Sequence, residues 1–110
     1  MPEPDDSAAV FLALADANRR FVLEVLARRP TATATELAAE LPVTRQAVAK
    51  HLELLRKAGL VRSTREGRES RYRLTPGPLG EAAQWLADVG GAWDKRLQAL
   101  RTYVEDERRA

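Results

Sequence analysis

Apolar residues recur at intervals of three and four along most of the 110-residue chain, which is the spacing of one face of an α-helix. The first such repeat predicts a short helix that begins at Asp6 or Ser7, where either side chain can cap it. The second repeat predicts a helix that begins at Asp16 or Asn18 and ends before Pro30. Two helices are therefore expected in the first third of the chain.

The next two repeats lie only three residues apart. A short helix is predicted over 35–41, capped by Thr33 or Thr35, and a longer one runs from its cap Thr44 to about Ala58. A turn of three residues between two helices is typical of a helix-turn-helix. The longer helix is amphipathic, with Val48, Leu52 and Leu55 on its apolar face, Ala47, Leu54 and Ala58 widening that face, and Arg45, Gln46, Ala49, Lys50, Glu53 and Lys57 opposite.

Strand spacing replaces helix spacing after Gly59. Residues 60–64 and 70–74 flank a turn that contains a glycine, which predicts a β-hairpin with Tyr72 facing inward and Arg71 facing outward. A proline- and glycine-rich break follows. The expected order is therefore four helices, a hairpin and a fifth helix, which is a mainly α winged helix-turn-helix fold.

The fifth helix, predicted over 79–104, has an unusually long apolar stripe that includes Leu86, Trp93 and Leu97. A terminal helix with so wide an apolar face needs a partner, and a second copy of the chain is expected; packing on its own domain alone is the alternative. Gly90 and Gly91 each cost about 1 kcal/mol in the middle of a helix, which indicates a kink or a close helix contact.

Composition restricts the chemistry. The chain has no cysteine, which excludes disulfides, zinc ribbons and thiol catalysis. It has neither the basic-then-apolar order of a signal peptide nor an apolar run of membrane-spanning length, so a cytoplasmic protein without a membrane partner is expected. Without paired carboxylates, a nucleophile–base set or a phosphate loop, neither an enzyme nor a cofactor site is expected.

Charge is unevenly distributed although the net charge is only +2. Residues 41–75 contain nine Lys and Arg against three Asp and Glu, whereas both flanking segments are net acidic. A polyanion would bind this middle segment. The alternative is a solvated basic face without a partner.

The polar face of the longer helix has the side chains that read bases in the major groove. Gln46 can pair with adenine and Arg45 with guanine, and Ala49 permits close approach or touches a thymine methyl group. Thr44 and Lys50 are expected on phosphates.

Other basic side chains lie beside this face. Arg65, Arg68 and Arg71 of the hairpin are expected to bind the minor groove or the adjacent phosphates; the alternative is that they only keep the hairpin soluble. His51 lies at the border of the apolar face, as a structural or phosphate-contacting residue. Glu53 either accepts from a cytosine amine or lies beyond the groove wall.

These segments resemble the ArsR/SmtB family of bacterial repressors. Residues 43–61, VTRQAVAKHLELLRKAGLV, are similar to the family's recognition helix and wing entry, 67–68 with 72–74 to its wing, and 12–20 to the start of its second helix. The family's metal-binding cysteines and histidines are absent from 35–41 and from the last helix, so its usual metal control is not expected. Ala49 stands where the family often has a small polar residue.

The resemblance implies a homodimeric repressor built on the first and last helices, with its recognition helices roughly 34–36 Å apart on a palindromic site. It also implies association with the nucleoid of a bacterium. The domains are then a disordered tail over 1–6, a DNA-binding domain over 7–75 and a dimerisation helix over 76–110. Alternatives are a winged-helix protein-interaction module and a metal sensor that uses Asp88 and Asp94; whether a small-molecule effector exists stays open. The expected dimer interface comprises Val10, Phe11, Leu14, Leu86, Val89, Trp93, Leu97, Leu100 and Val104.

Overall fold

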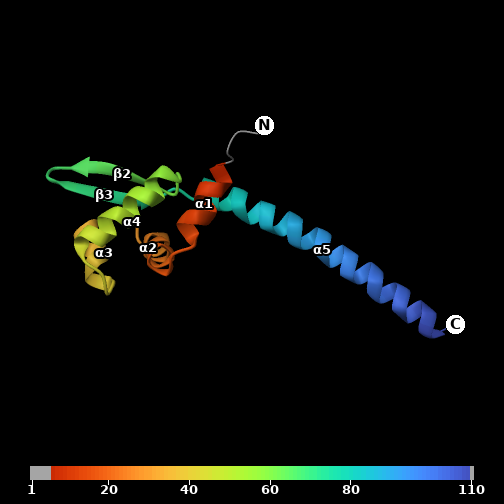
Figure 1. Ribbon diagram of the computed structural model, residues 1–110. Coiled ribbons are helices and arrows are strands. Elements are labelled where there is room, and N and C mark those ends of the chain that lie inside the picture. The colour runs from red at the N-terminus through yellow and green to blue at the C-terminus, as the bar shows by residue number, and fades with distance from the viewer. Residues whose placement is uncertain (1–5, 110) are drawn as a thin grey trace.

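The computed structural model describes residues 6–109, so the tail predicted over 1–6 lies outside the described residues except for its last position. The predicted order of helices and hairpin is confirmed, with one added strand (Figure 1). The elements are α1 (Asp6–Leu14), α2 (Ala17–Arg28), β1 (Ala32–Thr33), α3 (Ala34–Glu40), α4 (Arg45–Lys57), β2 (Val61–Glu66), β3 (Glu69–Leu74) and α5 (Gly77–Arg109).

One hydrophobic core holds α1 to α4 together against the base of the sheet. Val48, Leu52 and Leu55 of α4 are each 0% exposed, as their spacing predicted. Burying each such side chain contributes about 1.5–3 kcal/mol relative to leaving it in water. Leu54 was expected to widen this face but is 48% exposed, because it projects beside α1 rather than into the core.

Side-chain caps fix where the helices begin. Asp16 accepts hydrogen bonds from the backbone N–H groups of Asn18 and Arg19 at the start of α2. Thr33 and Glu36 form a reciprocal capping box at the start of α3, in which each side chain accepts from the other's backbone N–H at 3.1 Å. Thr44 accepts from the N–H of Ala47 at the start of α4. Each cap satisfies backbone donors that the first turn leaves unpaired.

The sheet has three antiparallel strands in the order β1-β3-β2. Two residues are too few to show a period, so β1 was not predicted. Its pairing makes β3 the central strand, with Arg71 between Thr33 of β1 and Thr64 of β2. The hairpin of β2 and β3, called the wing below, is therefore joined to the start of α3, because Thr33 belongs to the sheet and also caps that helix.

Helix α5 is a 33-residue extension on a compact body (Figure 1). It starts two residues before the predicted position, with Pro78 in the first turn, where the missing N–H costs nothing. It runs unbroken through Gly90 and Gly91, and Ala82 is its only buried residue. The described part of the chain thus measures 74 × 35 × 21 Å. Among the helices of residues 6–109, none combines the length and apolar character needed to span a bilayer.

Candidate nucleic-acid interface

The outer face of α4 presents polar side chains to solvent. Arg45, Gln46, Ala49 and Lys50 are all exposed, because the opposite face of the helix is locked into the core. The Thr44 hydroxyl oxygen caps the helix at 3.1 Å from the backbone nitrogen of Ala47, so a phosphate would meet this residue at the exposed helix start. The structure therefore brings the predicted residues of this helix together on one accessible surface.

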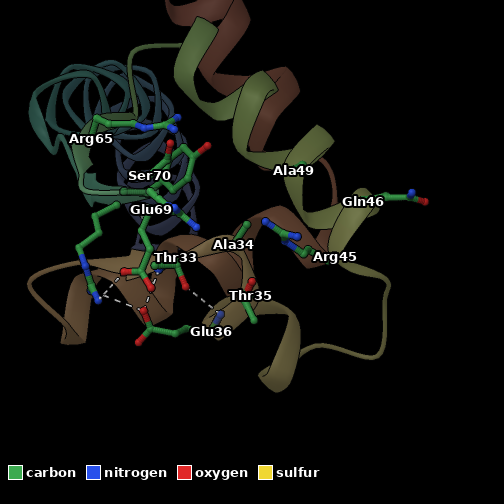
Figure 2. A pocket seen from close by; sticks show the side chains of 13 residues that line it. Thr33, Ala34, Thr35, Glu36, Arg45, Gln46, Ala49, Arg65, Glu69 and Ser70 are labelled. Atoms are coloured by element: carbon green, nitrogen blue, oxygen red, sulfur yellow. Dashed lines mark hydrogen bonds and ion pairs between the residues drawn. The ribbon is translucent and has the colours of Figure 1, made fainter.

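A hollow of about 640 Å³ lies between α3, the start of α4 and the hairpin (Figure 2). Arg45 points toward the hollow from α4, whereas Gln46 points away from it. Arg65 lies on the opposite wall, and Arg68 also lines the hollow. Cationic groups from α4 and from the wing thus lie on both sides of the hollow, whose lining also contains the carboxylates of Glu36 and Glu69.

The wing turn carries two arginines in open positions. Gly67 has a φ of 62°, a left-handed conformation that suits glycine and closes the hairpin. Arg65 donates to the Gly67 carbonyl at 3.4 Å, and Arg68 is exposed. Neither guanidinium makes an ion pair with a carboxylate of the described residues. Both remain available to an anionic partner.

Arg71, which alternation places on the outward side of the hairpin, differs from these two in its surroundings. Its side chain is only 28% exposed and lies within 3.5 Å of carboxylate oxygens from Glu36, Glu66 and Glu69. The backbone N–H of Thr33, followed by the guanidinium of Arg29, holds the pKa of Glu36 below its usual value, so this carboxylate stays charged. Arg71 therefore lies at the base of the wing among acids rather than on its open surface.

Glu53 and His51, the remaining polar residues considered on α4, lie in different surroundings. Glu53, exposed, accepts two hydrogen bonds from Arg56 at 2.6 and 3.0 Å, and this guanidinium lowers the pKa of the carboxyl group. The pair neutralises the one acid on this face. His51 is half-buried at the border of the core, and its Nδ1 has no hydrogen-bond partner among the described residues.

The apolar surfaces predicted for a dimer divide into two groups. Val10 is 1% exposed and packs in the chain's own core, so the prediction that it contributes to an interface is wrong. Phe11 and Leu14 are half-buried against that core, and Phe11 meets Trp85 edge-to-face with ring centres 5.5 Å apart. The predicted residues of α5 are between 42 and 60% exposed: Leu86, Val89, Trp93, Leu97, Leu100 and Val104.

Three residues with structural importance were not singled out from the sequence. Leu12, rather than Val10, is the large apolar residue of α1 that is exposed, at 71%. Glu36 and Arg29 form an ion pair at 2.5 Å beside Arg71. The spacing of Thr33 and Glu36 matches a capping box, so the role of Glu36 could have been predicted from the sequence. No sequence pattern indicated that arginines would pair with it.

Potential metal ligands are scattered in the described residues, where no three His, Cys, Asp or Glu side chains gather closely enough to hold an ion. Asp88 of α5 instead accepts a hydrogen bond from Gln84 at 2.8 Å.

Comparison with known proteins gives consistent relatives. A family described as a helix-turn-helix domain matches residues 14–64. The HTH-type transcriptional regulator Rv2034 of Mycobacterium tuberculosis is 38% identical over 95 residues, which cover 86% of this chain and 85% of the relative.

Solved structures extend the similarity to almost the whole chain. The ArsR-like transcriptional regulator from Rhodococcus sp. RHA1 has 44% identity and a TM-score of 0.81, covering 92% of each chain. The cadmium metal-sensor CMTR from Mycobacterium tuberculosis has 43% identity and a TM-score of 0.53, covering 61% of this chain and 68% of the sensor. The similarity is thus extensive for the first of these structures and partial for the metal sensor.

Proposed function

Because this chain belongs to the ArsR family of winged helix-turn-helix transcriptional regulators, we propose that it is a homodimeric repressor that binds a palindromic DNA operator. The observation that carries the proposal is the basic surface formed by exposed side chains at the front of α4 and at the wing tip. Arg45, Lys50 and Arg68 are exposed on it, and none is paired with a carboxylate in the described residues.

On this proposal α4 enters the major groove. Gln46 and Arg45 read base edges near the start of the helix, Lys50 and His51 approach the phosphates, and Ala49 lets the backbone come close to the bases. Arg65 and Arg68 reach the neighbouring minor groove, whose negative potential favours arginine. Discrimination would then come from α4 and much of the affinity from the wing.

The proposed dimer is supported by α5. Beyond Ala82 none of its described residues is buried, yet the helix carries two tryptophans, Trp85 and Trp93, on its surface. A contiguous apolar surface of this kind marks a protein–protein contact. A two-fold axis through α5 would present two copies of α4 to one side of the DNA, which explains why a palindromic site is expected.

Metal control through thiolates is not proposed for this chain. The related cadmium sensor is named for its metal, whereas this sequence contains no cysteine. We expect cadmium or zinc titration to leave the affinity for DNA unchanged. A metal-dependent change would assign a sensor built from carboxylates.

The test is binding to the DNA upstream of its own coding region, measured by fluorescence anisotropy at several salt concentrations. The logarithm of the affinity should fall linearly with the logarithm of the salt concentration, because phosphate contacts release counterions. The double variant Lys50→Glu/Arg68→Glu should bind on the order of 100-fold more weakly, since two contacts become repulsions.

The matched control is Arg108→Glu/Arg109→Glu, which changes the net charge equally at the far end of α5. It should bind DNA within a few-fold of the wild type. Equal losses in both double variants would show that only net charge matters and would refute the proposed surface. Absence of DNA binding by the wild type would favour a protein-interaction module instead.

A further inference from the structure

The wing has one basic side chain with an environment unlike that of the others. Arg71 lies in the central strand β3, and its guanidinium meets groups from three other segments. Nη1 lies 3.5 Å from an oxygen of Glu36 in α3 and donates to the Thr31 hydroxyl at 3.2 Å. Nε and Nη2 lie 3.5 and 3.3 Å from oxygens of Glu66 and Glu69 in the hairpin. One side chain thus links the hairpin to the start of the helix-turn-helix.

Both oxygens of the Glu36 carboxylate also have partners. Oε1 accepts from the backbone N–H of Thr33 at 3.1 Å and faces Arg71, while Oε2 accepts from Arg29 at the end of α2. It is therefore held in place from the helix that it caps and from α2. Because Glu36 is fixed, it can fix the position of Arg71 and of the strand that carries it.

The charge of this cluster argues against direct contact with DNA. Two guanidiniums, of Arg29 and Arg71, face three carboxylates, so the group as a whole is formally negative. A phosphate would be repelled by these carboxylates and would have to displace them from Arg71. Arg68 at the wing tip has no such competitors in the described part of the chain.

We infer that Arg71 is a positioning residue, which sets the angle of the wing relative to α3 and α4 without binding DNA itself. This inference rests on the proposed function, because the consequence of the angle is that Arg65 and Arg68 reach the groove beside α4. The outer part of the hairpin is exposed throughout residues 62–69, and only its base is held, by β1 and by the core contacts of Val61, Tyr72 and Leu74. A free hairpin would lose entropy on binding, which the cluster removes in advance.

The experiment compares Arg71→Met with Arg68→Met in salt-dependent DNA binding. Loss of a phosphate contact lowers the slope of log affinity against log salt by about one, whereas loss of positioning lowers the affinity without changing the number of contacts. We expect Arg71→Met to bind about tenfold more weakly with an unchanged slope. Arg68→Met should bind more weakly with a reduced slope.

Glu36→Gln should change the affinity for DNA in opposite directions, depending on whether Arg71 binds phosphate or positions the wing. It keeps the oxygen that accepts from Thr33 but removes a negative charge near the DNA-facing hollow. A phosphate-binding Arg71 would then bind DNA more tightly, whereas a positioning Arg71 loses its anchor, so we expect weaker binding. In the Arg71→Met background the same change should have no further effect. Glu40→Gln, which removes an exposed acid from the same helix, is the charge-matched control.

Circular dichroism establishes that each variant is folded at the assay temperature. Arg71→Lys replaces Arg71→Met if the latter unfolds, since lysine cannot reach three carboxylates at once.

Hydrogen exchange of the free protein supplies an independent measurement: amides of β2 and β3 should exchange faster in the Arg71 variant than in Arg68→Met. A slope reduced by one in Arg71→Met, tighter binding by Glu36→Gln, or unchanged affinity and exchange would each overturn the inference. Wild-type protein that binds no DNA would refute the proposed function, and the exchange comparison would still decide whether Arg71 holds the wing.

Discussion

The body of the protein and its long helix handle apolar residues in opposite ways. Helices α1 to α4 and the base of the sheet bury theirs in one core, where Val22, Leu52 and Leu60 are each 0% exposed. Along α5 beyond Ala82, apolar side chains recur just as regularly but remain in water, and Trp93 is 58% exposed. The same spacing therefore has two meanings, because burial depends on which surface the rest of the chain can cover.

The body is complete within one chain, whereas α5 is not. The body has its caps, its core and its sheet, whereas α5 offers an apolar stripe with little to cover it in its own chain. On our proposal a second chain covers it. Substitutions in the body should therefore change the stability of the fold, and those in α5 should change association.

The largest effect is expected in the core of the body. Leu52→Ala removes a fully buried side chain and should lower the free energy of unfolding by about 2–5 kcal/mol. Urea denaturation monitored by circular dichroism measures it. Leu97→Ala in α5, measured at a concentration where the chains are separated, is the control and should change this free energy little. Equal losses at both positions would contradict the division between body and helix.

The next effect concerns association. Trp93→Ala should weaken the dimer by about 2–4 kcal/mol, because Trp93 is exposed on the apolar stripe and tryptophan is enriched among the few residues that dominate the energy of an interface. Sedimentation equilibrium gives the dissociation constant. Lys95→Ala lies on the opposite face of α5 and should leave it unchanged. An unaltered constant for Trp93→Ala would place the interface elsewhere.

The glycine pair gives a smaller effect whose sign differs between neighbours. Beyond the neighbouring backbone of α5, no atom lies within 4 Å of a Cβ added at Gly90 or Gly91, so this chain gives no steric reason for either glycine. By helical spacing Gly90 borders the apolar stripe and Gly91 turns away from it. We expect Gly91→Ala to stabilise the protein by about 0.5–1 kcal/mol and Gly90→Ala to weaken the dimer. Thermal unfolding measures the stability of the two variants, and sedimentation measures their dimerisation. Identical behaviour of the two variants would show that the edge of the apolar stripe at Gly90 lies outside the interface.

The smallest effect is the acid response of the α2 cap in the body. Hydrogen bonds from the backbone N–H of Arg19, and then of Asn18, hold the pKa of Asp16 below its ordinary 3.8. Because the folded state has the lower pKa, the stabilising contribution is complete above this value and is lost as the pH falls through the folded-state pKa. Asp16→Asn keeps the cap but should show a smaller fall in urea midpoint from about pH 6 to about pH 3. An identical fall in both proteins would exclude Asp16 as a source of acid sensitivity.

Sequence patterns predicted those features of the fold that depend on residues close together in the sequence, such as the buried face of a helix. The buried face of α4 was predicted correctly at Val48, Leu52 and Leu55, because polar residues occupy the opposite face. Helix α1 has almost no polar residue to set its phase, so Val10 was assigned to the surface although Leu12 holds that place. Arg71 was predicted to point outward by alternation, but its acidic neighbour Glu36 comes from a distant part of the chain. Local rules give the face of an element, whereas its partners depend on the tertiary fold.

The attachment of α5 has a geometric consequence. Ala82 is the only buried residue of this helix, so its connection to the body is short compared with the roughly 40 Å of helix that follow, at 1.5 Å per residue. Over such a lever, a tilt of about ten degrees at the joint displaces the far end by about 7 Å. In a pair of chains joined along α5, small adjustments at Ala82 would therefore change the span between the two reading surfaces, and the tolerance for operators of different spacing would be set far from the DNA.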